Sequence, residues 1–254
     1  MASNIALRFV DDRAYVTLDR PDKHNGLTIE MLRDLVTTAH TVGGHKEARA
    51  VILSGNGPSF SSGLDIAGAG GDPLAAIRGF IPLPWRGTNT FQEACWAWRR
   101  LSVPVIAAIH GHCYGGGLQI ALAADVRFAG PDAEFSVMEA KHGLVPDMTG
   151  AATLSRLVGI DKALLLTMTA DIVDAAYAER IGLVTEMTPD PVAAAEKLAD
   201  RIALRSPHAV AGAKQLFDRS WHASARRTLA IERATQLPLI LRQAIFRRRR
   251  SQFR

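Results

Sequence analysis

The glycine triplet at residues 115–117 is the part of the sequence whose residue types and spacing point most directly to chemistry. It follows an apolar run, residues 103–109, that predicts a buried strand, and it leads into residues 118–125, which predict the start of a helix. A strand, a glycine turn and a helix N-terminus present free backbone N–H groups at the positive end of a helix dipole. Such a turn can hold a phosphate or an oxyanion that forms during a reaction, and Gln119 lies just inside the expected helix.

A second loop shares this property. Residues 62–65, with the sequence SGLD, follow a short buried strand predicted at residues 50–55. Two converging backbone N–H groups are what an oxyanion hole requires. Neither loop is specific alone, because a glycine triplet is more often a packing or turn device. From these residues by themselves, phosphate binding and oxyanion stabilisation both stay open.

The elements that must position these loops alternate between strand and helix. Residues 5–10 and 14–18 predict a hairpin, and Thr28 is expected to cap a helix. A helix is expected at residues 91–101, followed after the glycine turn by strands at 126–129 and 135–137. Further helices are expected at 154–158, 163–169 and 174–182, and a final strand at 183–186. From Pro191 the pattern is helical to the end, with interruptions at Pro207 and Pro238. The order predicts an α/β core over residues 1–190 and a helical C-terminal region over residues 191–254.

Composition excludes several classes of protein. Of the 254 residues, 48% are apolar, which is enough for a sizeable core, yet no apolar run is long enough to predict a membrane span. The N-terminus lacks the pattern of a secretory signal. The two cysteines, Cys95 and Cys113, do not suggest a disulfide framework. We therefore expect a cytoplasmic protein.

The net charge of +5 is concentrated near the C-terminus, where residues 247–250 are successive arginines. Nucleic-acid binding is one interpretation of such a run, and help in holding a phosphorylated ligand is another. A solvated tail is favoured over both, because no interleaved aromatic residues or known binding module accompany the run. We expect no nucleic-acid partner.

Five segments occur together in a recognisable order: RPDKHNGL (residues 20–27), VILSGNGPSFSSGLDI (51–66), VPVIAAIHGHCYGGGLQIALAADVRFAG (103–130), FSVMEAKHGLVPD (135–147) and AAYAERIGLVTEM (175–187). Through them the chain resembles, over nearly its full length, the crotonase family, also called the enoyl-CoA hydratase/isomerase family. The resemblance implies an α/β fold with a crotonase-like ββα spiral core and a C-terminal helical trimerisation region. It also implies a homotrimer or a dimer of trimers.

The resemblance further implies that the substrate is an acyl-CoA thioester, with no cofactor besides the CoA that the substrate carries. It assigns the oxyanion hole, which stabilises the thioester enolate, to the N–H groups of Leu64 and Gly116. It implies that substrate is bound by residues of two loops and the glycine turn, namely Lys23, His24, Ser62, Asp65, Ile66, Tyr114 and Pro146.

The acid and base positions differ from those of a typical hydratase. Such an enzyme has one Glu two residues after the glycine triplet and a second Glu twenty residues later, whereas this chain has Gln119 and Glu139. Hydration uses both carboxylates around one water, and an amide can orient water but cannot act as a base. One base is enough for isomerisation. The resemblance therefore favours double-bond isomerisation, with Glu139 as the main base.

Asp147 strengthens this interpretation. It lies eight residues after Glu139, where the family's dienoyl-CoA isomerases carry a catalytic Asp, and we expect it to be a second proton carrier. If Glu139 and Asp147 face one apolar pocket, desolvation and like-charge repulsion would raise the pKa of one of them.

Simpler roles stand beside these. Glu139 could be a helix-cap carboxylate, Asp147 could only cap the next helix, and Gln119 could fill space and hydrogen-bond the backbone instead of orienting water. A non-catalytic acyl-CoA-binding protein and a thioester hydrolase are the rival functions. Other residues are expected to have structural roles: packing for Cys113, no metal site at His110, His112 and His142, no serine nucleophile at Ser61 or Ser62, and a pocket or helix interface for Trp85, Trp96 and Trp98.

Overall fold

The main sheet begins with the predicted hairpin and continues with parallel strands. The structure, a computed structural model, describes residues 3–65, 78–84 and 86–252, with the backbone alone over 245–252. Strands β1 (Ile5–Val10) and β2 (Arg13–Leu18) pair antiparallel, which confirms the hairpin. The strands β3 (Ala50–Gly55), β4 (Val105–Ile109), β6 (Val126–Ala129) and β9 (Glu186–Met187) follow in parallel. Their order across the sheet is β1-β2-β3-β4-β6-β9.

A smaller sheet carries the chain away from the first one. It contains β5 (His112–Tyr114), β7 (Glu134–Ser136) and β8 (Val173–Asp174), with β5 and β7 parallel and β7 and β8 antiparallel. Because β5 follows β4 after a short turn, the glycine triplet directly follows a strand of the smaller sheet and not β4. The glycine triplet therefore stands at the junction of the two sheets.

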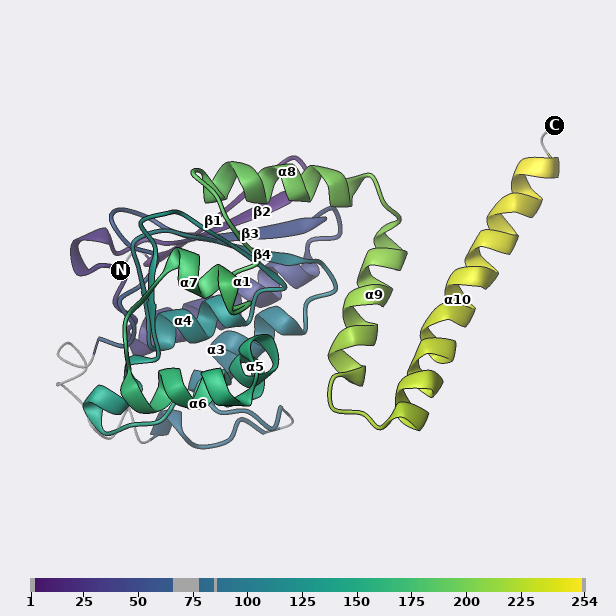
Figure 1. Cartoon of the computed structure of the whole chain (residues 1–254). Coiled ribbons are helices and arrows are strands. Elements are labelled where there is room, and N and C mark those ends of the chain that lie inside the picture. The colour runs from purple at the N-terminus through teal and green to yellow at the C-terminus, as the bar shows by residue number, and fades with distance from the viewer. Residues whose placement is uncertain (1–2, 66–77, 85, 253–254) are drawn as a thin grey trace.

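Helices cover both faces of the main sheet (Figure 1). The helices α1 (Ile29–Gly44), α3 (Thr90–Arg99) and α4 (Gly116–Leu122) lie on one side, and α8 (Pro191–Ala203) lies on the other. The strands alternate accordingly, since Val51 and Leu53 pack in the larger core cluster while Ile52 packs with Ala195 and Ala199 of α8. A sheet buried on both faces explains why its central strands read as continuous apolar runs.

Local signals place several helix ends where the sequence predicts them. Thr28 caps α1 by accepting a hydrogen bond from the N–H of Met31, as expected. Beyond the glycine turn lie η3 (Met138–His142), α5 (Gly150–Val158), α6 (Ile160–Thr169) and α7 (Ala175–Arg180), and Asp174 caps the last of these. The short helix η1 (Pro21–Lys23) forms the first part of the turn after β2.

Several boundaries differ from the prediction, and two of the differences have a clear local cause. Helix α4 begins at Gly116 instead of residue 118, because Gly115, with φ of 48°, already turns the chain out of its extended course. The final strand is Glu186–Met187 instead of residues 183–186. Leu183 and Val184 are buried in the core, and their N–H groups bond to the carbonyl of Ala178. That tight turn after α7 prevents them from extending the sheet.

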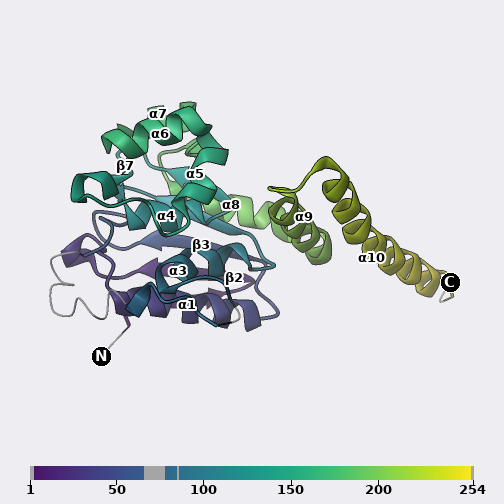
Figure 2. The same cartoon turned by 90° about the horizontal axis from the view of Figure 1, so that it is seen from below.

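The last two helices project from the rest of the molecule (Figures 1 and 2). Helix α9 (Pro207–Ser220) begins at Pro207 with Ser206 as its cap, so the predicted break there is confirmed. Helix α10 (Ala225–Gln252) runs through Pro238, so the second predicted interruption is wrong. Proline removes one intrahelical hydrogen bond, and in this long helix the turns on either side continue past it. The trimerisation role of the C-terminal region and its boundary at residue 190 stay predictions.

Among the helices of the described residues, none is both apolar enough and long enough to cross a lipid bilayer.

Candidate active site

The two loops predicted to expose N–H groups meet in the structure. Ser61 and Cys113 form a parallel bridge between them, and a side chain at Gly116 would lie 3.4 Å from Cγ of Leu64. A Cβ there would also lie 3.0 Å from Sδ of Met148, so any larger residue would force its neighbours to shift. The contact between the loops is long-range, because it joins the end of the β3 segment to the start of α4.

Backbone pairing turns the N–H of Leu64 away from its neighbouring segment. Leu64 pairs with Leu27 in a parallel bridge, in which the N–H of Leu27 bonds to the carbonyl of Gly63 and the N–H of Asp65 bonds to the carbonyl of Leu27. Leu64 lies between these two hydrogen bonds, so its own N–H points away from Leu27. Within the described residues, neither the N–H of Leu64 nor that of Gly116 donates a hydrogen bond. Two free donors therefore lie on adjacent loops.

Gln119 connects three parts of the site. Its Oε1 accepts hydrogen bonds from the N–H of Met148 at 2.9 Å and from the N–H of Gly150 at 2.8 Å. Its Nε2 donates to Oε1 of Glu139 at 2.7 Å. The side chain is 2% exposed, so these partners replace water. The expected backbone hydrogen bonds are present, whereas the bond to Glu139 is a contact that sequence reasoning missed.

Glu139 lies in the first turn of η3 and keeps one oxygen free. Its Oε2 is buried and has no hydrogen-bond partner among the residues that the structure describes. Burial raises the pKa of Glu139, and the charge of Asp147 raises it as well, while the hydrogen bond from Gln119 acts in the opposite direction. A carboxylate with one oxygen held and the other free is arranged to accept a proton from one direction.

Glu139 and Asp147 line the same cavity, whose volume is about 370 Å³. Burial raises the pKa of Asp147 too. Leu64 belongs to the same lining, and the remaining lining residues are mostly apolar: Leu27, Ile29, Asp65, Phe80, Phe91, Leu144 and Val145. The rings of Phe80 and Phe91 lie 4.8 Å apart, an aromatic pair in the lining that no sequence pattern indicated. The cavity thus combines three carboxyl side chains, of which Asp65 is paired with Arg20, with a mainly apolar wall.

Asp147 does not cap the next helix. The cap position of α5 is Thr149, in a left-handed conformation and without a side-chain cap bond. The interpretation of Asp147 as a simple N-cap is therefore wrong, since two residues separate it from the first helical residue. Its lining position beside Glu139 agrees with the shared apolar pocket considered for these two carboxyl groups from the sequence.

Other predicted substrate-binding residues cluster around the first loop. The N–H of Ser62 bonds to the carbonyl of His24, which places the turn at Lys23 and His24 against this loop. Nδ1 of His24 lies 2.9 Å from Oγ of Ser59. Asp65 pairs with Arg20 at 2.7 Å. The predicted turn and loop are therefore brought together.

Three predicted residues lie farther along the chain or outside the described part. Tyr114 donates its hydroxyl proton to Glu134 at 2.5 Å, and Pro146 directly precedes Asp147. Ile66 and Trp85 lie outside the described residues. Of the other tryptophans, Trp98 is fully buried in the core and Trp96 stacks near Arg99, and neither belongs to the described lining of the cavity.

The cysteines are packed inside the protein. Cys95 and Cys113 are both free and buried, and burial raises the pKa of both thiols. This agrees with the expected packing role of Cys113, because a buried thiol with a raised pKa is a poor nucleophile.

Comparisons with known proteins agree on one family. A family described as "Enoyl-CoA hydratase/isomerase" matches residues 12–244. The chain is similar to the short-chain-enoyl-CoA hydratase of Clostridium acetobutylicum, with 33% identity over 233 residues that cover 91% of this chain and 87% of that protein. It is also similar to the mitochondrial Delta(3,5)-Delta(2,4)-dienoyl-CoA isomerase of Rattus norvegicus, with 35% identity over 215 residues, 79% of this chain and 64% of that one. Among solved structures, an enoyl-CoA hydratase from Bacillus anthracis superposes with a TM-score of 0.85 at 27% identity, covering 94% of this chain and 91% of that one.

Proposed function

Because the chain belongs to the enoyl-CoA hydratase/isomerase family and is an enzyme of hydratase or isomerase kind, we propose that it moves a double bond along the acyl chain of an enoyl-CoA thioester. The observation that carries this proposal is the engagement of Gln119. Its amide holds one oxygen of Glu139 and two backbone N–H groups, so a single carboxylate, and not a pair, occupies the usual hydration positions.

The N–H groups of Leu64 and Gly116 form the oxyanion hole in this proposal. Removing a proton beside a thioester carbonyl places negative charge on the carbonyl oxygen. Two fixed donors stabilise that charge without reorganisation, and loss of one such donor typically costs about 3–4 kcal/mol. Both N–H groups lack an acceptor among the described residues, and their loops are in contact.

Glu139 is the base that starts the reaction. Its free Oε2 removes a proton from C2 of a 3-enoyl thioester, and the electrons spread over C2 to C4 and the thioester oxygen. The same carboxyl group returns the proton at C4, which leaves the double bond between C2 and C3 and restores the carboxylate. Burial favours this role, because a raised pKa makes the protonated intermediate form of Glu139 easier to reach near neutral pH.

Asp147 becomes important when the two carbons are farther apart. Isomerisation of a 3,5-dienoyl thioester to the 2,4-dienoyl product removes a proton at C2 and adds one at C6. Asp147, in its protonated form on the same cavity, can supply the proton at C6 while Glu139 holds the one from C2. Exchange of protons between the two carboxyl groups and water then restores the starting state.

Gln119 makes efficient hydration the less favoured reaction. An amide oxygen cannot take a proton from water at neutral pH, and both of its acceptor positions here are occupied by backbone N–H groups. Gln119 is therefore a positioning residue for Glu139 in this proposal.

The remaining assignments follow the same family. The CoA thioester is bound by residues of the loops around the cavity: Lys23, His24, Ser62, Asp65, Ile66, Tyr114 and Pro146. CoA enters as part of the substrate, and the reaction uses no separate cofactor. The enzyme works in the cytoplasm as a homotrimer or a dimer of trimers.

Product analysis with three substrates tests the proposal. The full chain is incubated separately with 3-enoyl-, 3,5-dienoyl- and 2-enoyl-CoA in deuterated water, and products are followed by mass spectrometry. We expect isomers of the first two, with deuterium incorporated into the 2,4-dienoyl product, because its C6 proton comes from a second carboxyl group. We expect hydration of 2-enoyl-CoA to be at least about a hundredfold slower, the scale of one general acid–base group.

Each rival function has its own outcome in this experiment. Rapid hydration that survives Glu139→Gln would contradict the proposed chemistry. Release of free thiol would indicate a thioester hydrolase. Tight binding of all three thioesters with no product from any of them would indicate a non-catalytic binder.

A further inference from the structure

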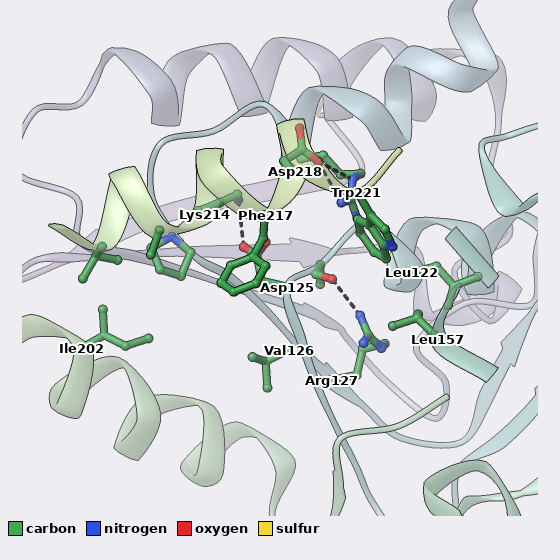
Figure 3. A pocket seen from close by; sticks show the side chains of 15 residues that line it. Leu122, Asp125, Val126, Arg127, Leu157, Ile202, Lys214, Phe217, Asp218 and Trp221 are labelled. Atoms are coloured by element: carbon green, nitrogen blue, oxygen red, sulfur yellow. Dashed lines mark hydrogen bonds and ion pairs between the residues drawn. The ribbon is translucent and has the colours of Figure 1, made fainter. Parts of the chain in front are cut away.

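A second cavity of about 380 Å³ lies where α9 meets the core, and no residue assigned above to thioester chemistry lines it. Figure 3 shows Lys214 and Phe217 of α9 on one side and Val126 and Arg127 of β6 on the other. Leu122, Leu157 and Ile202 add to an apolar wall. Ligand sites in proteins have this composition, with a mainly apolar lining and a few polar groups that converge.

The two carboxylates on this cavity are already neutralised. Nζ of Lys214 lies 2.7 Å from Oδ2 of Asp125, and Nη2 of Arg99 lies 2.8 Å from Oδ1 of Asp218. Lys214 also donates to the carbonyls of Trp98 and Val103, so its three protons are all used. These two ion pairs leave no net charge on the cavity.

Arg127 adds a positive charge that nothing else in the lining balances. Its residue surface is 4% exposed. Nε donates to the carbonyl of Leu183 and Nη1 to the carbonyl of Ala124, while Nη2 has no partner among the described residues. Within that part of the chain, no carboxylate lies at ion-pair distance from Arg127.

The charge persists at neutral pH. Burial lowers the pKa of Arg127 to about 10, with Asp125 raising it and Arg99 lowering it further, so the guanidinium stays protonated. A second arginine adds to the field, because Arg156 lies 5.0 Å from the ring centre of Trp221, which lines the cavity. Buried charge without a counterion is costly, which favours an anion at this place.

We propose that this cavity is a second ligand site, which binds a small organic monocarboxylate with its carboxylate on Nη2 of Arg127 and its apolar body against Val126, Leu157 and Phe217. A carboxylate matches the planar guanidinium. A single negative charge matches Arg127, the unbalanced cation among the described residues of the lining. The volume is at the small end of ligand sites, which limits the acid to a short chain or a single ring.

Calorimetric titration with hexanoate tests the site directly. Sodium hexanoate is titrated into the full chain, with hexanamide as the uncharged analogue of the same shape. We expect the acid to bind at least about tenfold more tightly, which corresponds to about 1.4 kcal/mol. Equal binding of acid and amide, or no saturable binding of hexanoate, would overturn the proposal.

Saturated acyl-CoA distinguishes this site from the thioester cavity, the name given to the cavity lined by Glu139 and Asp147. The titration is repeated with excess butyryl-CoA, which has no double bond to move. We expect the hexanoate affinity to be unchanged, and loss of binding under competition would overturn the proposal. This outcome does not depend on whether the enzyme isomerises or hydrates its substrates.

Two tryptophan substitutions on α9 provide a matched pair. Ala213 is exposed and lines the cavity, whereas Gln215 is exposed on the same helix and lies outside the lining. Ala213→Trp is expected to weaken hexanoate binding at least about tenfold, and Gln215→Trp to leave it unchanged. Binding that survives Ala213→Trp would contradict the assigned place.

Arg127→Met tests the charge itself. We expect it to abolish the preference for hexanoate over hexanamide, and retention of that preference would overturn the role of Arg127. If this variant does not fold, the comparison of acid with amide and the pair on α9 still decide the proposal.

Discussion

The cavity lined by Glu139 and Asp147 and the cavity at α9 have nearly the same volume and opposite charge. The thioester cavity, about 370 Å³, is lined by Glu139 and Asp147, whereas the cavity at α9, about 380 Å³, carries Arg127 beside two neutral ion pairs. Both have apolar walls, so in both a charge is poorly solvated. The difference lies in how each buried charge can be neutralised.

A carboxylate is neutralised when it takes up a proton, but a guanidinium cannot lose its proton at neutral pH. In the thioester cavity, burial raises the pKa of Glu139, which makes the protonated form of this carboxyl group easier to reach. In the cavity at α9, Arg127 keeps its positive charge, so only a bound anion can neutralise it. Buried acid thus suits proton transfer, whereas buried arginine suits binding.

The cavities also differ in what holds them together. The thioester cavity is positioned by segments of the central core, and all seven residues of α4 beside it are buried. The cavity at α9 has one wall on a helix in which Gly212 is the one buried residue among those described. That wall is fixed to the core largely by the ion pairs of Lys214 and Asp218.

The largest effect on this comparison is expected from Glu139→Gln. Loss of the base should lower kcat for 3-enoyl-CoA by about 10²- to 10⁴-fold, because general acid–base catalysis contributes on that scale. Steady-state kinetics and butyryl-CoA binding measure the two parts separately, and binding should be retained. Glu186→Gln, at an exposed position on β9, is the control. An unchanged kcat in Glu139→Gln would remove the distinction between a reactive and a binding cavity.

Lys214→Met should destabilise the protein by about 3 kcal/mol, because it leaves the carboxylate of Asp125 without its buried partner. Urea denaturation measures the free energy of unfolding. Lys197→Met, at an exposed position on α8, should change it by less than about 0.5 kcal/mol. Equal stability of the two variants would show that the ion pair does not fix α9 to the core.

Asp147→Asn should have a smaller and selective effect. We expect isomerisation of 3,5-dienoyl-CoA to fall about ten- to a hundredfold, with little change for 3-enoyl-CoA, because only the longer proton transfer uses the second carboxyl group. Rates with the two substrates measure this directly. An equal loss with both would mean that Asp147 supports the cavity without carrying a proton.

The smallest effect concerns pH. Since burial raises the pKa of Glu139 above the ordinary 4.5, the native state binds this proton more tightly than the unfolded state does. The stability associated with Glu139 is therefore present below the unfolded pKa and is lost as pH rises through the native pKa. Glu139→Gln should have a higher Tm than the natural chain at neutral pH, and the difference should vanish below about pH 4.5, the ordinary value for glutamate.

The pH dependence of the rate is a second measurement of the pKa of Glu139. Because the base must be deprotonated, kcat should fall as pH decreases through the raised pKa of Glu139. A Tm difference that stays constant from acidic to neutral pH would show that Glu139 is not held in the proposed environment.

Local patterns allowed much of the fold and part of the site to be predicted. The hairpin, the Thr28 cap and the strand before the glycine triplet follow from alternation, capping chemistry and an apolar run. Boundaries were less predictable, since α10 continues through Pro238 and α4 starts inside the glycine triplet. The roles of the residues at the site, including the backbone N–H groups of Leu64 and Gly116 as an oxyanion hole, stay predictions.

The sequence alone determined the family, the order of the elements and the identity of the departure at Gln119, because these depend on residue types and on short-range spacing. The tertiary structure decided what those residues contact. Gln119 reaches Glu139 and the backbone near Met148 across 20 and 29 residues, and Arg99 reaches Asp218 across 119. No local propensity encodes such pairs, because they arise only when distant segments pack and exclude water from the polar groups between them.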